Sequence, residues 1–77
     1  MAKTVLTVLM ARKGIRNVDI ARQFRITEIE VSRWKGGRGY VPPKWRQPLA
    51  EMLGVKVEDI LDERGIARLA DEEEEEV

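Results

Sequence analysis

The sequence predicts an all-α protein, a compact bundle of four to five short helices, and three observations support this prediction. Apolar residues recur at helical spacing in several short segments, and residues that cap helices stand at the ends of these segments. The chain has 77 residues, of which 43% are hydrophobic and 36% are charged. This length and composition suit one small domain with a thin core, expected over residues 1–64, before an acidic C-terminal tail over residues 65–77.

Several functions are excluded by residue types that the chain lacks. There is no Cys, and therefore no disulfide framework or thiolate metal site, and no His, the commonest catalytic base and metal ligand. Ser32 is the only serine, and neither His nor Cys can activate it. We therefore expect no enzyme, cofactor, metal site or small-molecule substrate. No apolar run approaches the roughly 18 residues of a membrane span, so we expect a cytoplasmic protein without a membrane partner.

The net charge of zero hides two segments of opposite charge. Residues 1–56 hold 12 Lys or Arg and 4 Asp or Glu, a net charge of +8. Residues 57–77 hold 2 and 10 of these residues, a net charge of −8. Asp71 to Glu76 form an uninterrupted acidic block, which we expect to be disordered.

Two helices are predicted before residue 27. The first covers residues 4–12 and ends at Gly14, although its threonines and valines would also suit a strand. The second is expected to be capped by Asn17, with Asp19 in the first turn, where the helix dipole favours an anion. Ile20 and Phe24 then share its inner face.

The domain is predicted to be organised around the segment Thr27 to Trp34. Thr27 and Glu30 have the spacing of a capping box, so a helix should begin at Glu28. At about 100° per residue, Val31 and Trp34 fall on one face of this helix, which can be buried.

The opposite face of the same helix carries Ile29 and Arg33, which are four residues apart. An exposed Ile beside an exposed Arg suits a helix in the DNA major groove, where Arg can bind guanine and an aliphatic group can touch a thymine methyl. Arg25 and Ile26 leave only a tight connection before Thr27, and two short helices joined by so brief a turn form a helix-turn-helix.

The run from Gly14 to Gly37 resembles the helix-turn-helix of the Cro and phage-repressor family, also called the XRE family. The resemblance extends to residues 49–55 and 57–61, which look like the fourth and fifth helices of that family, so it covers about residues 4–62. It implies a lambda-repressor-like DNA-binding domain. The matching packed positions are Ile20, Ala21, Phe24, Ile26, Val31 and Trp34, followed by a basic, glycine-rich loop.

Three positions depart from the family pattern. Arg25 stands where many members have Gly, and a residue with a side chain at positive φ is uncommon. Arg16 replaces the usual capping Ser, and Asn17 replaces a Gln that often binds a phosphate. Pro48 would lie inside a fourth helix begun at Pro43; either that helix is kinked, or a separate helix starts with Pro48.

The resemblance implies a transcriptional regulator that binds double-stranded DNA, as a homodimer on a two-fold operator. Individual residues keep a second interpretation. Glu28 either accepts from a cytosine or complements the helix dipole, Arg33 either reads a base or contacts a phosphate, and Ile29 could contact a protein instead. Tyr40 and Trp45 either stack on sugars or cover the core. The residues expected to read bases are Glu28, Ile29, Ser32 and Arg33, and those expected to bind phosphates are Asn17, Lys35, Arg38 and Lys44.

Two further hypotheses concern the C-terminal part of the chain. Ile60, Leu61, Ile66 and Leu69 could extend a helix that pairs two subunits. The acidic block either keeps the protein soluble or competes with phosphates for the basic surface, and in the second case deleting residues 71–77 would raise nonspecific DNA affinity at low salt. The alternative function is a helix-turn-helix protein-interaction module, such as an antirepressor or an antitoxin-like adaptor, that does not read DNA.

Overall fold

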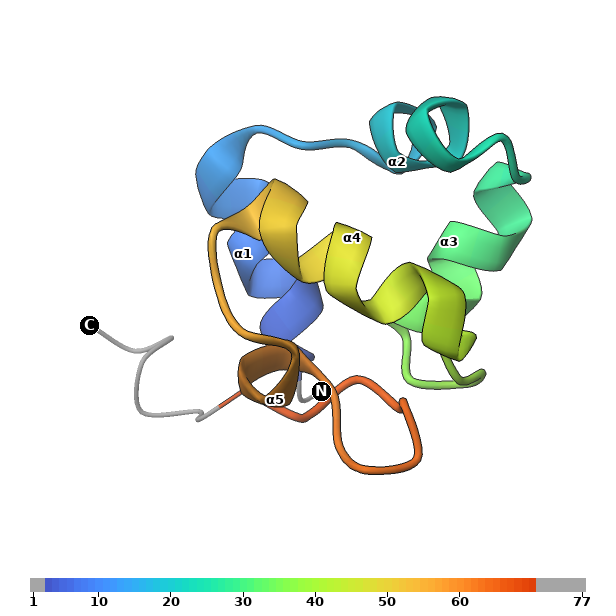
Figure 1. Cartoon of the computed structure of the whole chain (residues 1–77). Helices are drawn as coiled ribbons and strands as arrows, with labels where there is room; N and C mark the ends of the chain where they lie inside the picture. Colours follow the sequence, from blue (N-terminus) through green and yellow to red (C-terminus); the bar gives the residue numbers. More distant parts are fainter. Residues whose placement is uncertain (1–2, 71–77) are drawn as a thin grey trace.

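The computed structural model describes residues 3–70, and the predicted all-α architecture is confirmed for this part of the chain. Two isolated antiparallel bridges, Thr4 to Leu69 and Leu61 to Ala67, connect the segments around the helices. None of the helices formed by residues 3–70 has the length and apolar character needed to cross a membrane. The helices are α1 (Val5–Lys13), α2 (Asn17–Phe24), α3 (Glu28–Lys35), α4 (Pro43–Leu53) and α5 (Val57–Ile60) (Figure 1).

Helix α1 has strong signals at both ends, which explains why the segment is a helix rather than a strand. The Thr4 hydroxyl accepts a hydrogen bond from the Thr7 N–H at 3.1 Å. Gly14 ends the helix in the left-handed conformation, with φ of 69°. Between the two caps, Leu6 and Met10 are buried one helical turn apart in the core.

Helix α2 begins at Asn17, but the expected capping role of Asn17 is wrong. The residue before the helix is Arg16, and the carboxylate of Asp19 accepts its backbone N–H at 2.8 Å. This bond, followed by the hydrogen bond from the Arg16 side chain, holds the pKa of Asp19 below its ordinary value. Asp19 thus supplies a side-chain bond at this end of the helix, because a carboxylate in the first turn can reach back to the amide of the cap residue. The Asn17 Oδ1 is buried and has no hydrogen-bond partner within the described part of the chain.

The connection from α2 to α3 turns at Arg25, which adopts φ of 59° and ψ of 46°. Among residues 3–70 it is the only residue other than glycine with a positive φ. Its conformation lets the next N–H, of Ile26, bond to the carbonyl of Ala21 at 2.9 Å. Arg25 therefore ends α2 in the left-handed conformation that glycine usually adopts at this position. For a residue with a side chain, this conformation costs about 1–2 kcal/mol.

Helix α3 begins at Glu28, as predicted. The Glu30 N–H donates to the Thr27 hydroxyl at 3.2 Å, which is the first of the two bonds of the expected capping box. Val31 is 0% exposed and Trp34 is 1% exposed, whereas Ile29 on the opposite side is 74% exposed. The predicted division of this helix into a buried and an exposed face is therefore confirmed.

Helix α4 starts with Pro43 and runs without interruption through Pro48. Of the two alternatives for this segment, the separate helix that starts with Pro48 is therefore wrong. Pro43 suits the first position, where an N–H has no helical partner, but Pro48 cannot donate to the carbonyl of Lys44. The helix tolerates this loss because Leu49 and Leu53 in the following turns are completely buried.

The chain after α5 returns across the start of α1 instead of extending a helix. The Val5 N–H donates to the Arg68 carbonyl at 2.8 Å, and the Ala70 N–H donates to the Lys3 carbonyl at 2.6 Å. The hypothesis of a longer helix that pairs subunits is wrong for residues 61–70, because Ile60 ends α5 and Leu61 is buried in the core.

The folded unit consequently extends beyond residue 64, where the sequence led us to place the start of the tail. Ala67 and Ala70 are each 7% exposed, so both belong to the packed structure. Residues 71–77, for which we expected disorder, lie outside the described residues.

Three aromatic rings join α2, α3 and α4 in the core. The ring of Phe24 stacks on Trp45 with centroids 4.6 Å apart and an interplanar angle of 9°, and it lies 6.4 Å from Trp34 in a tilted arrangement. The interpretation of Trp45 as a core residue is thus confirmed. The same interpretation is wrong for Tyr40, which is 59% exposed because it lies on the loop between α3 and α4.

Candidate functional site

The exposed face of α3 brings together the residues expected to read bases. Figure 1 shows α3 at one edge of the molecule, with its C-terminal end close to the loop that leads to α4. Glu28, Ile29 and Arg33 are exposed, and Ser32 is half-buried. Since Val31 and Trp34 fix the rotation of the helix about its axis, the position of Ile29 and Arg33 at the surface follows from the core packing.

Arg33 lies against the loop that follows its own helix. A Cβ atom added to Gly39 would be 3.5 Å from the Arg33 Nε and 3.8 Å from its Nη2. The Arg38 N–H also donates to the Arg33 carbonyl at 3.0 Å. The Arg33 side chain therefore lies beside Gly39 of the loop, at a distance that would be an ordinary contact for an added Cβ, a proximity that the sequence analysis missed. The glycine-rich loop was the only signal that could have indicated it.

The C-terminal end of α3 is held by Thr4, which caps α1, and by Thr7 in the first turn of α1. The hydroxyl of Thr4 donates to the Lys35 carbonyl at 2.6 Å, and the Thr7 hydroxyl donates to the same oxygen at 3.3 Å. These bonds satisfy a carbonyl that has no partner inside its own helix. They fix the position of Lys35, whose side chain is half-buried, relative to the rest of the domain.

The other residues expected to bind phosphates lie on three different elements. Arg38 is exposed, and its Nε lies 3.4 Å from the position of a Cβ added to Gly36. Lys44 is exposed in the first turn of α4, with its Nζ 5.3 Å from the centroid of the Trp45 ring. Asn17 is half-buried at the start of α2.

Arg46, another cation near this loop, has a structural role. Its Nε donates to the Val41 carbonyl at 2.7 Å, and its Nη2 donates to the Arg64 carbonyl at 3.2 Å. The side chain packs over Gly65, which has a φ of 85°. Arg46 therefore holds the turn at residues 62–65 against the start of α4.

The electrostatic character of the described region is basic. Residues 3–70 contain all 14 Lys and Arg residues and 8 of the 14 acidic ones, a net charge of +6. Within this region the ion pairs closer than 4 Å are Arg16 with Asp19 and Arg64 with Asp62. The cations that follow α3 are thus not paired with carboxylates of residues 3–70.

Comparison of the chain with protein-family models, with curated proteins and with solved structures found no match. The resemblance to the Cro and phage-repressor family accordingly rests on the residue pattern of this chain. The exposed face of α3 and the cations around it therefore provide the basis for proposing a function for this protein.

Proposed function

We propose that this protein is a cytoplasmic, sequence-specific DNA-binding transcriptional regulator of the phage-repressor type. In this proposal α2 and α3 form the helix-turn-helix of a lambda-repressor-like domain, and α3 enters the major groove. The observation that carries the proposal is the division of α3: Ile29, 74% exposed, and Arg33 face outward, while Val31 and Trp34 are buried. A short helix with these two residues outward matches the combination of guanine and thymine-methyl contacts that direct readout uses.

Base recognition is assigned to the exposed side of α3. Arg33 forms a bidentate contact with a guanine, and Ile29 contacts a thymine methyl group. Glu28 accepts from a cytosine amino group and Ser32 bonds to a base edge. Arg33 also lies beside Gly39 of the following loop, with its Nε 3.5 Å from the position of an added Cβ.

Phosphate binding is assigned to three cations and to the amide of Asn17. Lys35 and Arg38 follow α3 directly, Lys44 lies at the start of α4, and Asn17 lies at the start of α2. Their contacts orient the domain on the duplex and make its affinity depend on salt. In this proposal the protein acts as a homodimer on half-sites about one DNA turn apart.

The decisive experiment is selection of bound duplexes from a random pool at two salt concentrations. We expect a symmetric preferred sequence, with nonspecific binding that falls as the salt concentration rises. A variant with Ile29→Ala and Arg33→Ala should lose the sequence preference, whereas Arg12→Ala, a change to an exposed cation at the end of α1, should keep it. A wild-type pool without enrichment at either salt concentration would exclude the proposal.

A protein-interaction module is the second possibility, and the 74% exposure of the apolar Ile29 favours it. The carboxylates of Glu28 and Glu30 in the first turn of α3 also oppose the approach of phosphates. This function predicts no salt-dependent DNA binding. It predicts instead that one protein co-purifies with the wild type but not with Ile29→Ala.

A further inference from the structure

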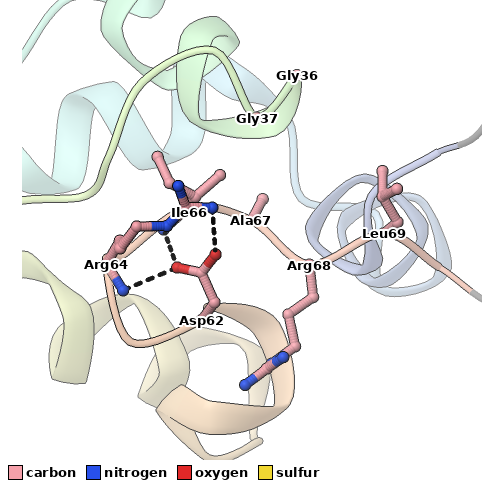
Figure 2. A pocket seen from close by; sticks show the side chains of 8 residues that line it. All are labelled: Gly36, Gly37, Asp62, Arg64, Ile66, Ala67, Arg68 and Leu69. Carbon is pink, nitrogen blue, oxygen red and sulfur yellow. Dashed lines mark hydrogen bonds and ion pairs between the residues drawn. The ribbon is translucent and has the colours of Figure 1, made fainter.

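An open hollow of about 510 Å³ lies where the end of α3 meets the segment after α5. Figure 2 shows Gly36 and Gly37 on one side of it and the chain from Asp62 to Leu69 on the other. The residues that line it are Gly36, Gly37, Asp62, Arg64, Ile66, Ala67, Arg68 and Leu69.

The charged groups of this hollow leave a positive surface. Asp62 is its only acidic lining residue, and its carboxylate accepts from the Ile66 N–H at 3.0 Å, the Arg64 N–H at 2.9 Å and the Arg64 guanidinium at 3.2 Å. Arg68 uses its Nε for the Glu58 carbonyl at 2.8 Å, so its two terminal nitrogens remain available. Arg38 does not line the hollow, but its Nε lies 3.4 Å from the position of a Cβ added to the lining residue Gly36, so a third guanidinium lies close by.

The described part of the chain ends beside the same hollow, and the acidic block follows it in the sequence. Leu69 forms part of its wall, and the next residue, Ala70, is fixed by the hydrogen bond from its N–H to the Lys3 carbonyl. Asp71 to Glu76 follow directly and carry six carboxylates, against a net charge of +6 on residues 3–70. Six extended residues can span about 20 Å.

We propose that the segment Asp71 to Glu76 docks in this hollow of its own chain, where its carboxylates pair with Arg38, Arg64 and Arg68. The charge complementarity and the point at which the chain leaves Ala70 both favour this occupant. A consequence, which rests on the proposed function, is that the docked carboxylates compete with DNA phosphates at Lys35 and Arg38. The segment then weakens nonspecific DNA binding without contacting the base-reading face of α3.

Docking is tested without DNA by zero-length carbodiimide cross-linking of the full chain, which joins carboxylates to lysines. Two lysines have backbones close to this region: the Lys3 carbonyl accepts from the Ala70 N–H, and Lys35 directly precedes Gly36 of the hollow. Lys13 is the control, because it lies nine residues along α1 from Thr4, about 14 Å away. We expect cross-links from residues 71–76 to Lys3 and Lys35 to exceed those to Lys13 severalfold at low salt, and to disappear near 1 M salt.

Two variants assign the cross-links to the hollow. Arg68→Ala should reduce their yield severalfold, whereas Arg22→Ala, a change to an exposed arginine on α2, should leave it unchanged. Equal yields at Lys13 and Lys35, or an unchanged yield in Arg68→Ala, would overturn the proposal. Cross-links that join two chains and increase with protein concentration would assign the hollow to the segment of a second copy and would also overturn it.

The effect of the acidic segment on DNA binding is tested with a full-length variant that carries Asp71→Asn and a Glu→Gln change at each of residues 72–76. We expect its affinity for a nonspecific duplex at low salt to rise about tenfold, with the difference lost near 1 M salt. The control is Glu51→Gln, which removes one exposed carboxylate from α4. Equal affinities of the neutral variant and the wild type would overturn the competition. If neither chain bound DNA, the proposed function would fail, and the cross-links would still decide the docking.

Discussion

The hydroxyl of Thr4 donates a hydrogen bond of 2.6 Å to the carbonyl oxygen of Lys35. It joins the residue that precedes α1 to the last residue of α3, so the candidate recognition helix is fixed by a segment far away in the sequence. The same oxygen of Thr4 also caps α1 by accepting the Thr7 N–H. Thr4 is 4% exposed, which protects both bonds from exchange with water.

Replacing Thr4 should therefore reduce the free energy of unfolding. Thr4→Val keeps the shape of the side chain but removes the cap of α1 and the donor to Lys35, at an expected cost of about 1–3 kcal/mol. Urea denaturation measures this difference. Thr4→Ser retains the hydroxyl and should lose less, so a Val variant as stable as the Ser variant would show that the hydrogen bonds contribute little.

Two glycines with positive φ allow a matched comparison. Gly14 has open space around the position of an added Cβ, whereas a Cβ at Gly65 would collide with the guanidinium of Arg46. Gly14→Ala should cost only the left-handed conformation, about 1–2 kcal/mol. Gly65→Ala should cost about 3 kcal/mol or more, because it also displaces the donor to the Val41 and Arg64 carbonyls.

The collision at Gly65 can be separated from the conformational cost by a double-mutant cycle. In a background of Arg46→Ala, the cost of Gly65→Ala in urea denaturation should fall to that of Gly14→Ala. Additive effects of the two changes would mean that Arg46 does not hold this turn.

Asp62 should make stability depend on pH below neutrality. The hydrogen bond from the Ile66 N–H, followed by those from Arg64, lowers the pKa of this carboxyl in the folded chain, although partial burial opposes the shift. A lowered pKa contributes stability that is complete above the pKa of the unfolded chain and is lost as the pH falls through the folded pKa. The urea midpoint should therefore be constant near neutral pH and decrease below about pH 4.

The contribution of Asp62 can be isolated by substitution. Asp62→Asn keeps an acceptor oxygen but removes the charge, so its urea midpoint should be lower at pH 7 and less dependent on acid than that of the wild type. Glu63→Gln, a change at the exposed neighbouring residue, provides the control. Parallel pH profiles of Asp62→Asn and the wild type would exclude this role.

The proposed DNA-binding roles predict that some substitutions reduce sequence preference and that others reduce the affinity for all DNA sequences. Arg33→Ala should cost about 1–3 kcal/mol of specific binding free energy and relax the preference at one base position. Lys35→Ala or Lys44→Ala should weaken binding to all sequences alike and reduce the salt slope by about one unit. Fluorescence titration of specific and nonspecific duplexes distinguishes these outcomes. An unchanged ranking of preferred sites in Arg33→Ala would contradict its assignment to base reading.

Local sequence patterns were sufficient to predict helix α3 and to predict which of its faces is buried and which is exposed. The start of α3 at Glu28 followed from the capping residue Thr27, and the burial of Val31 and Trp34 followed from their spacing. The end of α1 at Gly14 was equally local, because only the conformation of one residue decides it. The exposure of Ile29 and Arg33, on which the proposed function depends, was thus determined by the sequence itself.

Long-range contacts decided what the sequence left open. Residues 65–70 look like the start of an acidic tail, yet they pack against the start of α1 because Val5 and Lys3 supply hydrogen-bond partners. Pro48 remains inside α4 because the buried leucines after it outweigh one lost helical bond. The inward orientation of Arg46 and the hollow beside Gly37 exist only because segments more than 15 residues apart meet. Helical periodicity and caps act within a few residues, whereas these contacts depend on the position of the whole backbone.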